Sequence, residues 1–136
     1  MSLNTVKLIE FKENGILGSG VLSFIENGQI QDFNINRVYW IYGTGDTELN
    51  RGNHAHKYDE QVIICLHGQI EIEIIDQKNN TKNYILNSPN KGLFIPKLLW
   101  KNILVAPESI ILCISSSLYK TEDYIKDFSD FLNYNS

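Results

Sequence analysis

The sequence has few cysteines and no long apolar run. Cys65 and Cys113 are its only cysteines, and each lies in a short apolar segment (VIICL and IILCI), which argues against a disulfide framework and predicts two buried, reduced thiols. The N-terminal MSLNTVKLIEF lacks a basic region followed by a long apolar stretch. We therefore expect neither a signal peptide nor a transmembrane helix, and a cytoplasmic location.

Positive charge is also scarce. Lys and Arg total 12 against 16 for Asp and Glu, a net charge of −4, and the basic residues are scattered rather than gathered in a stripe. Nucleic acid and membrane surfaces are therefore not expected as partners. Hydrophobic residues make up 43% of the 136 and charged residues 21%, which is ordinary globular composition. A single domain spanning residues 1–136 can bury a core without disulfides or a structural metal.

Short strand-like segments recur as far as about residue 117. They are VLSFIE, RVYWIY, QVIICL, QIEIEII, NYILN, GLFIP and SIILCI. In QIEIEII, Ile70, Ile72 and Ile74 fall on one face and Glu71 and Glu73 on the other. Turn residues separate these segments, with a tight turn at His67-Gly68, a hairpin loop at 76–81 and a longer loop at 43–50. The pattern predicts an all-β barrel or sandwich.

The last segment has a different period. KTEDYIKDFSDFLNY carries apolar residues at helical spacing, namely Tyr124, Ile125, Phe128, Phe131 and Leu132. Thr121 is a suitable N-cap. The sequence therefore predicts a C-terminal helix over about 121–134 that closes the barrel.

One motif, RGNHAHKYDEQVIICLHG (residues 51–68), indicates a site. In a strand, residues i and i+2 point to the same side, so His54 and His56 project together into the barrel; a solvated pair at a strand start is the alternative. The stretch resembles the first cupin signature, His-x-His, three or four residues, Glu, six residues, Gly. Here Gln61 stands at the Glu position. The second signature is matched by GLFIPKLLWKN with Gly92 and Pro96, but Lys101 replaces its histidine.

These two replacements change the expected chemistry. An amide is a weak ligand for a first-row divalent ion, and a lysine ammonium repels one. We therefore expect no metal ion in this site. His54 and His56 are then available for acid–base work, to which imidazole is well matched near neutral pH.

Over nearly its whole length the chain is similar to one cupin family, the WxcM-like sugar 3,4-ketoisomerases. The matching pieces are INRVYWIYGT, RGNHAHKYDEQVIICLHG, LNSPNKGLFIPKLLW and YKTEDYIKDFSDF. The resemblance implies a double-stranded β-helix (jelly roll) and a homodimer with exchanged N-terminal strands. It also implies that dTDP-4-oxo-6-deoxy-glucose is converted to a 3-oxo sugar, a precursor of amino sugars in surface polysaccharides such as lipopolysaccharide.

Such a reaction requires a base, a proton relay and a group that holds negative charge, but no redox cofactor, so we expect no cofactor. We expect His54 to take the C3 proton, His56 to relay or orient, and Lys101 to stabilise an enediolate, although the order within the histidine pair stays open. The remaining expected substrate-binding residues are Arg37 and Arg51 at the diphosphate, together with Tyr39, Gln61 and Trp100.

Three other functions fit parts of the sequence. A non-catalytic cupin that binds a nucleotide sugar needs the arginines but no histidine pair. A metal-dependent cupin oxygenase or isomerase needs the acidic ligand that Gln61 replaces. A cupin sugar 3,5-epimerase also uses a histidine base, but the RGNHAH motif and the tail favour the ketoisomerase.

Overall fold

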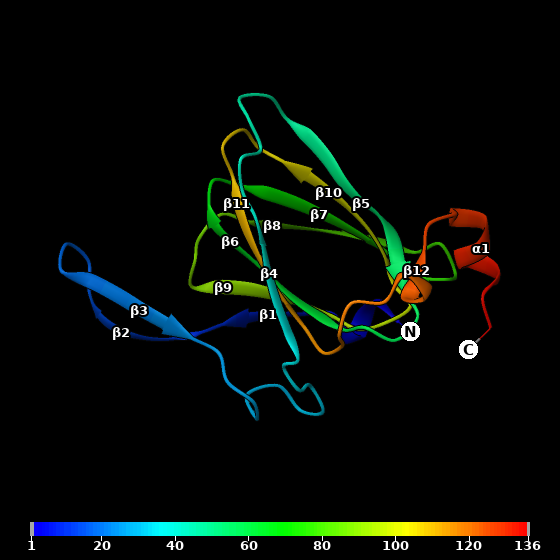
Figure 1. Ribbon diagram of the computed structural model, residues 1–136, viewed down its shortest axis with the longest axis horizontal. Coiled ribbons are helices and arrows are strands. Elements are labelled where there is room, and N and C mark those ends of the chain that lie inside the picture. The colour runs from blue at the N-terminus through cyan, green and yellow to red at the C-terminus, as the bar shows by residue number, and fades with distance from the viewer. Residues whose placement is uncertain (1, 136) are drawn as a thin grey trace.

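The fold consists of two five-stranded antiparallel sheets and a separate hairpin (Figure 1). The computed structural model describes residues 2–135. One sheet has the order β1-β9-β6-β11-β4, the other β12-β5-β10-β7-β8, and β2 and β3 form the hairpin. The strands are β1 (Lys7–Glu10), β2 (Lys12–Ile16), β3 (Gly20–Phe24), β4 (Arg37–Ile41), β5 (Leu49–His56), β6 (Gln61–His67), β7 (Ile70–Ile75), β8 (Thr81–Leu86), β9 (Lys91–Ile95), β10 (Trp100–Val105), β11 (Ile110–Ser115) and β12 (Tyr124–Ile125). The predicted all-β jelly roll is confirmed.

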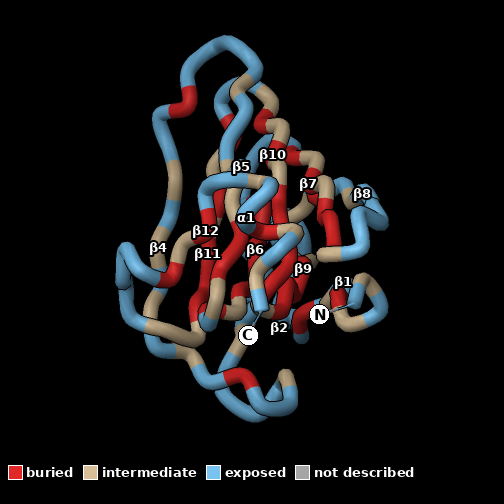
Figure 2. The backbone as a smooth tube through the Cα atoms, turned by 90° about the vertical axis from the view of Figure 1, so that its right-hand side faces the viewer, coloured by how far each residue is buried: buried red, intermediate tan, exposed pale blue. Residues whose placement is uncertain are grey.

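Apolar side chains from both sheets form the main core of the barrel. On β7, Ile70, Ile72 and Ile74 are fully buried, and Glu71 and Glu73 alternate with them, as predicted. Figure 2 shows the buried residues concentrated along the strands of the two sheets and the exposed ones in the loops around them. The turn at 68–69 and the loop at 76–80 lie where the sequence predicted them. The turn connects β6 to β7, which belong to different sheets, and the loop joins the paired strands β7 and β8.

Strand β6 is buried on both faces, which explains its unbroken apolar run. Ile63 and Cys65 face the barrel interior. Val62 and Ile64 face outward and pack under a second apolar cluster that contains Phe11 and Phe33. The chain between β3 and β4 thus acts as a cover for the outer face of this sheet. Cys65 and the other cysteine, Cys113, are both buried free thiols, as predicted.

Strands β2 and β3 form an arm that projects from the barrel (Figure 1). Every residue of both strands is exposed. The arm nevertheless carries large apolar side chains, and Leu17 at its turn is 92% exposed. Within residues 2–135, no residue of these two strands is buried by the rest of the chain. An antiparallel hairpin with no packed face is marginal in water.

The predicted C-terminal helix over 121–134 is wrong in its first half. Thr121–Asp123 form a 3-10 turn (η2), Tyr124–Ile125 form β12, and helix α1 covers only Phe128–Asn133. Asp127 rather than Thr121 is the N-cap, and its side chain accepts a hydrogen bond from the backbone N–H of Asp130. Pairing of β12 with β5 outweighs the helical spacing of this segment.

The helices of this fold are short. Besides η2 and α1, there is a 3-10 turn, η1, at Leu3–Thr5. Among residues 2–135, no helix has the length and apolar character needed to cross a membrane.

Candidate active site

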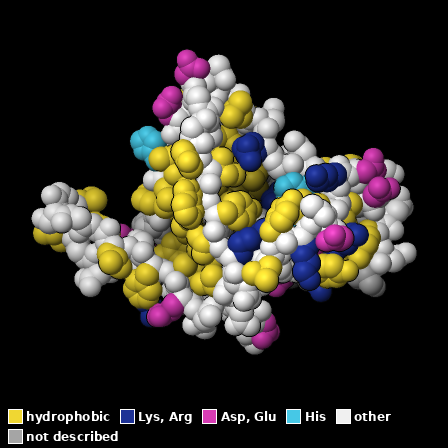
Figure 3. Space-filling model, viewed as in Figure 1, with side chains coloured by type: hydrophobic (Ala, Val, Ile, Leu, Met, Phe, Trp, Pro, Cys, Tyr) yellow, Lys and Arg dark blue, Asp and Glu magenta, His cyan; other side chains and the backbone are white. Residues whose placement is uncertain are grey.

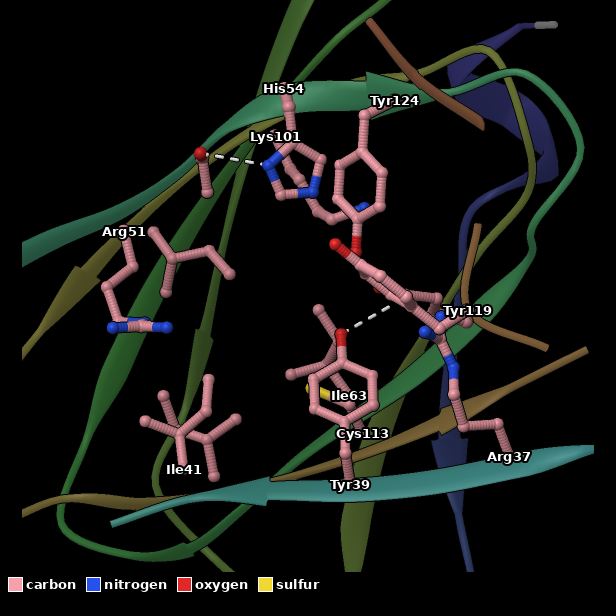
Figure 4. Close-up of a pocket in the computed structure, with 14 residues that line it drawn as sticks. Arg37, Tyr39, Ile41, Arg51, His54, Ile63, Lys101, Cys113, Tyr119 and Tyr124 are labelled. Carbon is pink, nitrogen blue, oxygen red and sulfur yellow. Dashed lines mark hydrogen bonds between the residues drawn. The ribbon is translucent and has the colours of Figure 1, made fainter. Parts of the chain in front are cut away.

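A cavity of about 410 Å³ lies inside the barrel (Figure 4). This volume suits a small-molecule ligand. Strands β4, β5, β6, β10 and β11 and the C-terminal segment supply its walls. The lining residues are Arg37, Tyr39, Ile41, Arg51, Gly52, His54, Gln61, Ile63, Lys101, Ile103, Ile111, Cys113, Tyr119 and Tyr124.

His54 lies in the cavity wall with its ring orientation fixed by the backbone. Its Nδ1 atom is 2.9 Å from the carbonyl oxygen of Gly52. Because a carbonyl only accepts hydrogen bonds, Nδ1 carries the proton and Nε2 has a free lone pair. Burial, followed by the nearby charge of Lys101, lowers the pKa of His54 to about 4. The ring is therefore neutral and ready to accept a proton at pH 7.

His56 lies beside His54 and is 2% exposed. The two ring centroids are 4.9 Å apart and the rings are nearly perpendicular. The Nδ1 atom of His56 is 2.9 Å from Oδ2 of Asp123. Burial, then the charge of Lys101, lowers the pKa of His56 well below its ordinary value. Both expected histidines are thus neutral and close together, but only His54 reaches the cavity surface.

Lys101 stands opposite His54 across the β5–β10 pair and is 4% exposed. Burial lowers its pKa to about 8, while Cys113, Asp59 and Asp123 act in the opposite direction. Lys101 therefore remains mostly protonated at pH 7. An ammonium group in a cavity with largely apolar walls is well placed to stabilise an anion.

A break in strand β5 brings Arg51 and His54 into the same cavity. Residues three apart in a regular strand face opposite sides. Here Gly52 and Asn53 have positive φ angles of 82° and 58°, and the β5–β10 register shifts between Lys101 and Asn102. A Cβ atom on Gly52 would lie 2.8 Å from the Lys101 carbonyl oxygen. Glycine at this bulge is therefore required both by its backbone angle and by close packing.

Gln61 connects Tyr39 through hydrogen bonds to Asp59 and Ser115. Its Nε2 atom lies 3.0 Å from the Tyr39 hydroxyl, 3.0 Å from Oδ2 of Asp59 and 3.1 Å from Oγ of Ser115. Burial, then the proximity of Cys113, raises the pKa of Tyr39 far above its ordinary value. Tyr39 therefore keeps its proton and can donate a hydrogen bond, whereas Gln61 holds the phenol in place.

The two arginines differ in how they are held. Arg37 is paired with the buried Asp59 at 3.2 Å, and its guanidinium carbon lies 5.2 Å and 5.6 Å from the ring centroids of Tyr39 and Tyr119. Arg51 makes no ion pair with any other described residue. Figure 4 shows the two arginines on opposite sides of the cavity. An unpaired guanidinium facing a cavity suits an anionic ligand.

Trp100 does not line the cavity, contrary to the expectation. Its ring packs against Phe128 and Phe131, at centroid distances of 5.2 Å and 5.7 Å, and its Nε1 donates to Asn102. Side chains alternate along β10, so Lys101 points inward and Trp100 outward. Its structural role is to anchor the C-terminal helix.

The sequence did not single out the part of the site that comes from the C-terminal segment. Tyr119 and Tyr124 line the cavity, and the Tyr124 ring centroid lies 4.9 Å from that of His54 and 4.6 Å from that of His56. Tyr124 occupies this place because it pairs with His56 in the β12–β5 ladder. No local pattern in YKTEDYIKDF distinguishes this arrangement from a helix.

The residues present do not fit a metal ion. At the two exchanged ligand positions, the Gln61 amide nitrogen faces three acceptors and Lys101 is a cation. His56, Asp59 and Asp123 do lie close enough together to be considered as a second ligand set. Their groups are already engaged, however, because Asp59 accepts from Arg37 and Gln61, and His56 donates to Asp123.

A family profile described as "FdtA: WxcM-like, C-terminal" matches residues 4–136. A curated relative from Aneurinibacillus thermoaerophilus, named TDP-4-oxo-6-deoxy-alpha-D-glucose-3,4-oxoisomerase, is 35% identical over 130 residues, covering 94% of this chain and 91% of the relative.

Two solved structures agree with this match. QdtA, a sugar 3,4-ketoisomerase from Thermoanaerobacterium thermosaccharolyticum in complex with TDP, has a TM-score of 0.87 at 32% identity, over 97% of this chain and 95% of that one. A 3,4-ketoisomerase from Helicobacter canadensis has a TM-score of 0.85 at 36% identity, over 95% and 96%. The chain therefore belongs to the WxcM-like family of sugar 3,4-ketoisomerases.

Proposed function

We propose that this protein is a metal-independent isomerase that moves the keto group of a dTDP-4-oxo-6-deoxy-hexose from C4 to C3. The observation that carries the proposal is one cavity in which a neutral imidazole, a buried ammonium group and a protonated phenol converge, from His54, Lys101 and Tyr39. These are the base, the anion stabiliser and the hydrogen-bond donor that an enediol mechanism requires.

The proposed reaction needs no net redox change. The C4 ketone acidifies the C3 hydrogen, and His54 Nε2 takes that hydrogen as a proton while the electron pair moves onto O4. The Lys101 ammonium stabilises the resulting enediolate, which is protonated on O4 to give the enediol. Loss of the O3 proton to the histidine pair and return of a proton to C4 then give the 3-oxo sugar. All protons removed are returned, so substrate and product are isomers.

Arg51 is the proposed contact for the diphosphate. It faces the cavity without a carboxylate partner among the described residues, whereas Arg37 is held by Asp59. We assign Arg37 a role at the opposite side of the cavity, where it fixes Tyr39 and Tyr119. The nucleotide dTDP follows from the relatives, one of which was solved with TDP. This substrate is consistent with a cytoplasmic enzyme of deoxyamino-sugar synthesis for surface polysaccharides.

We also propose a homodimer with exchanged N-terminal strands. Two surfaces support it. The first is the exposed arm of β2 and β3, with Leu17 at its turn. The second is the outer face of the edge strand β4, where Val38 and Trp40 are exposed, together with Tyr42 directly after the strand. Figure 3 shows hydrophobic side chains on the projecting arm and over the adjoining face of the barrel. An arm from a second copy would cover this edge and this apolar surface together.

Product analysis tests the proposed function directly. The purified protein, treated with a chelator, is incubated with dTDP-4-oxo-6-deoxy-glucose in D₂O, and the sugar is followed by proton NMR. A 3-oxo product with deuterium at C4 is the expected result. Binding without conversion would instead favour the non-catalytic cupin, and deuterium at C5 with an altered C5 configuration would favour the epimerase.

A further inference from the structure

The C-terminal segment brings a carboxylate to the second histidine of the site. Asp123 lies at the end of η2, is 5% exposed, and is 67 residues from His56 in the sequence. Its Oδ2 atom accepts from Nδ1 of His56 at 2.9 Å. Its Oδ1 atom accepts from the backbone N–H of Tyr58 at 2.7 Å and lies 3.4 Å from that of Asp59.

These backbone bonds fix which oxygen faces the imidazole. Because Oδ1 is engaged by two main-chain donors, Oδ2 is left to His56, and the carboxylate cannot rotate without losing them. The segment itself is held in place by β12, where Tyr124 pairs with His56, and by a backbone bond from Lys57 N–H to the Asp123 carbonyl at 2.8 Å. The orientation of Asp123 is thus determined by the fold.

We propose that Asp123 is a positioning residue of this isomerase, which fixes His56 as the Nδ1–H tautomer and leaves its Nε2 atom as a proton acceptor. This inference rests on the proposed function. The Nε2 atom of His56 is buried and has no hydrogen-bond partner among the described residues. A buried acceptor without a partner costs free energy and is typically retained where the atom has work to do.

Asp123 also offsets the charges that oppose protonation of His56. Lys101 on β10, Arg37 on β4 and the neighbouring His54 on β5 all disfavour an imidazolium at this place. The ring of Tyr124 on β12 covers both histidines. Among residues 2–135, Asp123 and Asp59 are the carboxylates that cluster within 4.8 Å of the His56 ring, and Asp59 is paired with Arg37. Asp123 is therefore the group that stabilises the positive charge when His56 receives a proton from His54.

The substitution Asp123→Asn tests the tautomer. The backbone donors of Tyr58 and Asp59 require an oxygen at the Oδ1 position, so the new amide nitrogen takes the place of Oδ2. It then donates to His56 Nδ1, and the ring proton moves to Nε2, which can no longer accept a proton. The equivalent exchange in serine proteases lowers kcat about 10⁴-fold.

We expect kcat of Asp123→Asn to fall by ~10²–10⁴-fold with KM nearly unchanged. The matched control is Asp76→Asn. Asp76 is also buried and accepts from the backbone N–H of Lys78 and Asn80, but lies in the β7–β8 loop outside the cavity. This control should lose a comparable amount of thermal stability and keep its kcat.

Nitrogen NMR of ¹⁵N-histidine protein reads the tautomer without substrate. The chain has three histidines, of which His67 is exposed. The signals of His54 and His56 are told apart with the His54→Asn variant, in which only one buried ring remains. We expect Nδ1–H in the wild type and Nε2–H in Asp123→Asn. An Nε2–H tautomer in the wild type, or a kcat of Asp123→Asn within threefold of an active wild type, would overturn the proposal. A wild type that shows the Nδ1–H tautomer but converts no substrate would count against the proposed function alone.

Discussion

Replacement of Lys101 by an uncharged residue should lower the catalytic rate and raise the stability of the fold. Lys101 is 4% exposed, and burial lowers its pKa from an ordinary 10.5 to about 8. That difference corresponds to about 3 kcal/mol by which the fold disfavours the charged form. The unfolded chain therefore binds more protons than the folded one between pH 8 and 10.5, and wild-type stability rises with pH over this range. At pH 7 Lys101 is charged in both states, so the full free-energy cost of burying its ammonium group lowers the stability of the fold.

Lys101→Met removes the charge and keeps a similar length and shape. We expect the variant to be more stable than the wild type at pH 7, by up to about 3 kcal/mol, and this advantage should shrink as the pH rises toward 10. Its kcat should fall by ~10²–10³-fold, the usual effect of removing one group that stabilises developing charge. Thermal melts across pH and steady-state rates provide the two measurements.

The pH dependence of the reaction gives an independent check. In the wild type, kcat/KM should fall about tenfold per pH unit above a pKa of about 8, as Lys101 loses its proton. Lys101→Arg keeps a cation whose pKa exceeds 12, so this alkaline limb should disappear. Burial raises the pKa of Cys113 to about 11 and raises that of Tyr39 far above its ordinary value, so neither group would replace Lys101 near pH 8. An unchanged limb in Lys101→Arg would refute the assignment.

Three further predictions concern other parts of the site. His54→Asn should keep nucleotide binding but lower turnover by ~10²–10⁴-fold and abolish C3 deuterium exchange; exchange at the wild-type rate would place the base elsewhere. Arg51→Ala should mainly raise KM, because it removes on the order of 1.5–3 kcal/mol of binding free energy. A large loss of kcat at constant KM would instead show that Arg51 takes part in the chemical step. Trp40→Asp should shift the molar mass in solution from dimer toward monomer, while Ile85→Asp, at a similarly exposed site on β8, should not; equal behaviour of the two variants would argue against the proposed interface.

Local periodicity predicted those parts of the fold that depend on neighbours in the sequence. The alternation in β7 predicted its buried face, and the spacing of His54 and His56 predicted two adjacent imidazoles. Strand alternation also makes inward positions for both Trp100 and Lys101 incompatible, since consecutive residues point to opposite sides. The sequence alone did not indicate which of the two would face the cavity.

The features of the fold and site that the sequence did not predict depend on contacts between segments far apart in the chain. Tyr124 has helical spacing relative to Phe128, yet its pairing with His56 draws it into a strand. The Asp123–His56 contact joins residues that share no local pattern. Likewise, the bulge at Gly52 and Asn53 is set by packing against Lys101 rather than by a turn motif. Such features arise from tertiary structure, which outweighs local propensity.

The bulge in β5 also limits which sequence changes this site can tolerate during evolution. The bulge reverses the alternation of inward and outward side chains between Arg51 and His54. The proposed diphosphate contact and the proposed base therefore lie on one strand, but the inward direction of each is set by a different half of that strand. Deletion of one residue at 52–53 would restore a regular ladder and turn one of the two groups out of the barrel, even though no functional side chain had been removed. The number of residues in β5 is therefore as constrained as the type of residue at each functional position. A substitution on one side of the bulge leaves the other side in place, whereas an insertion or deletion within the bulge displaces Arg51 or His54.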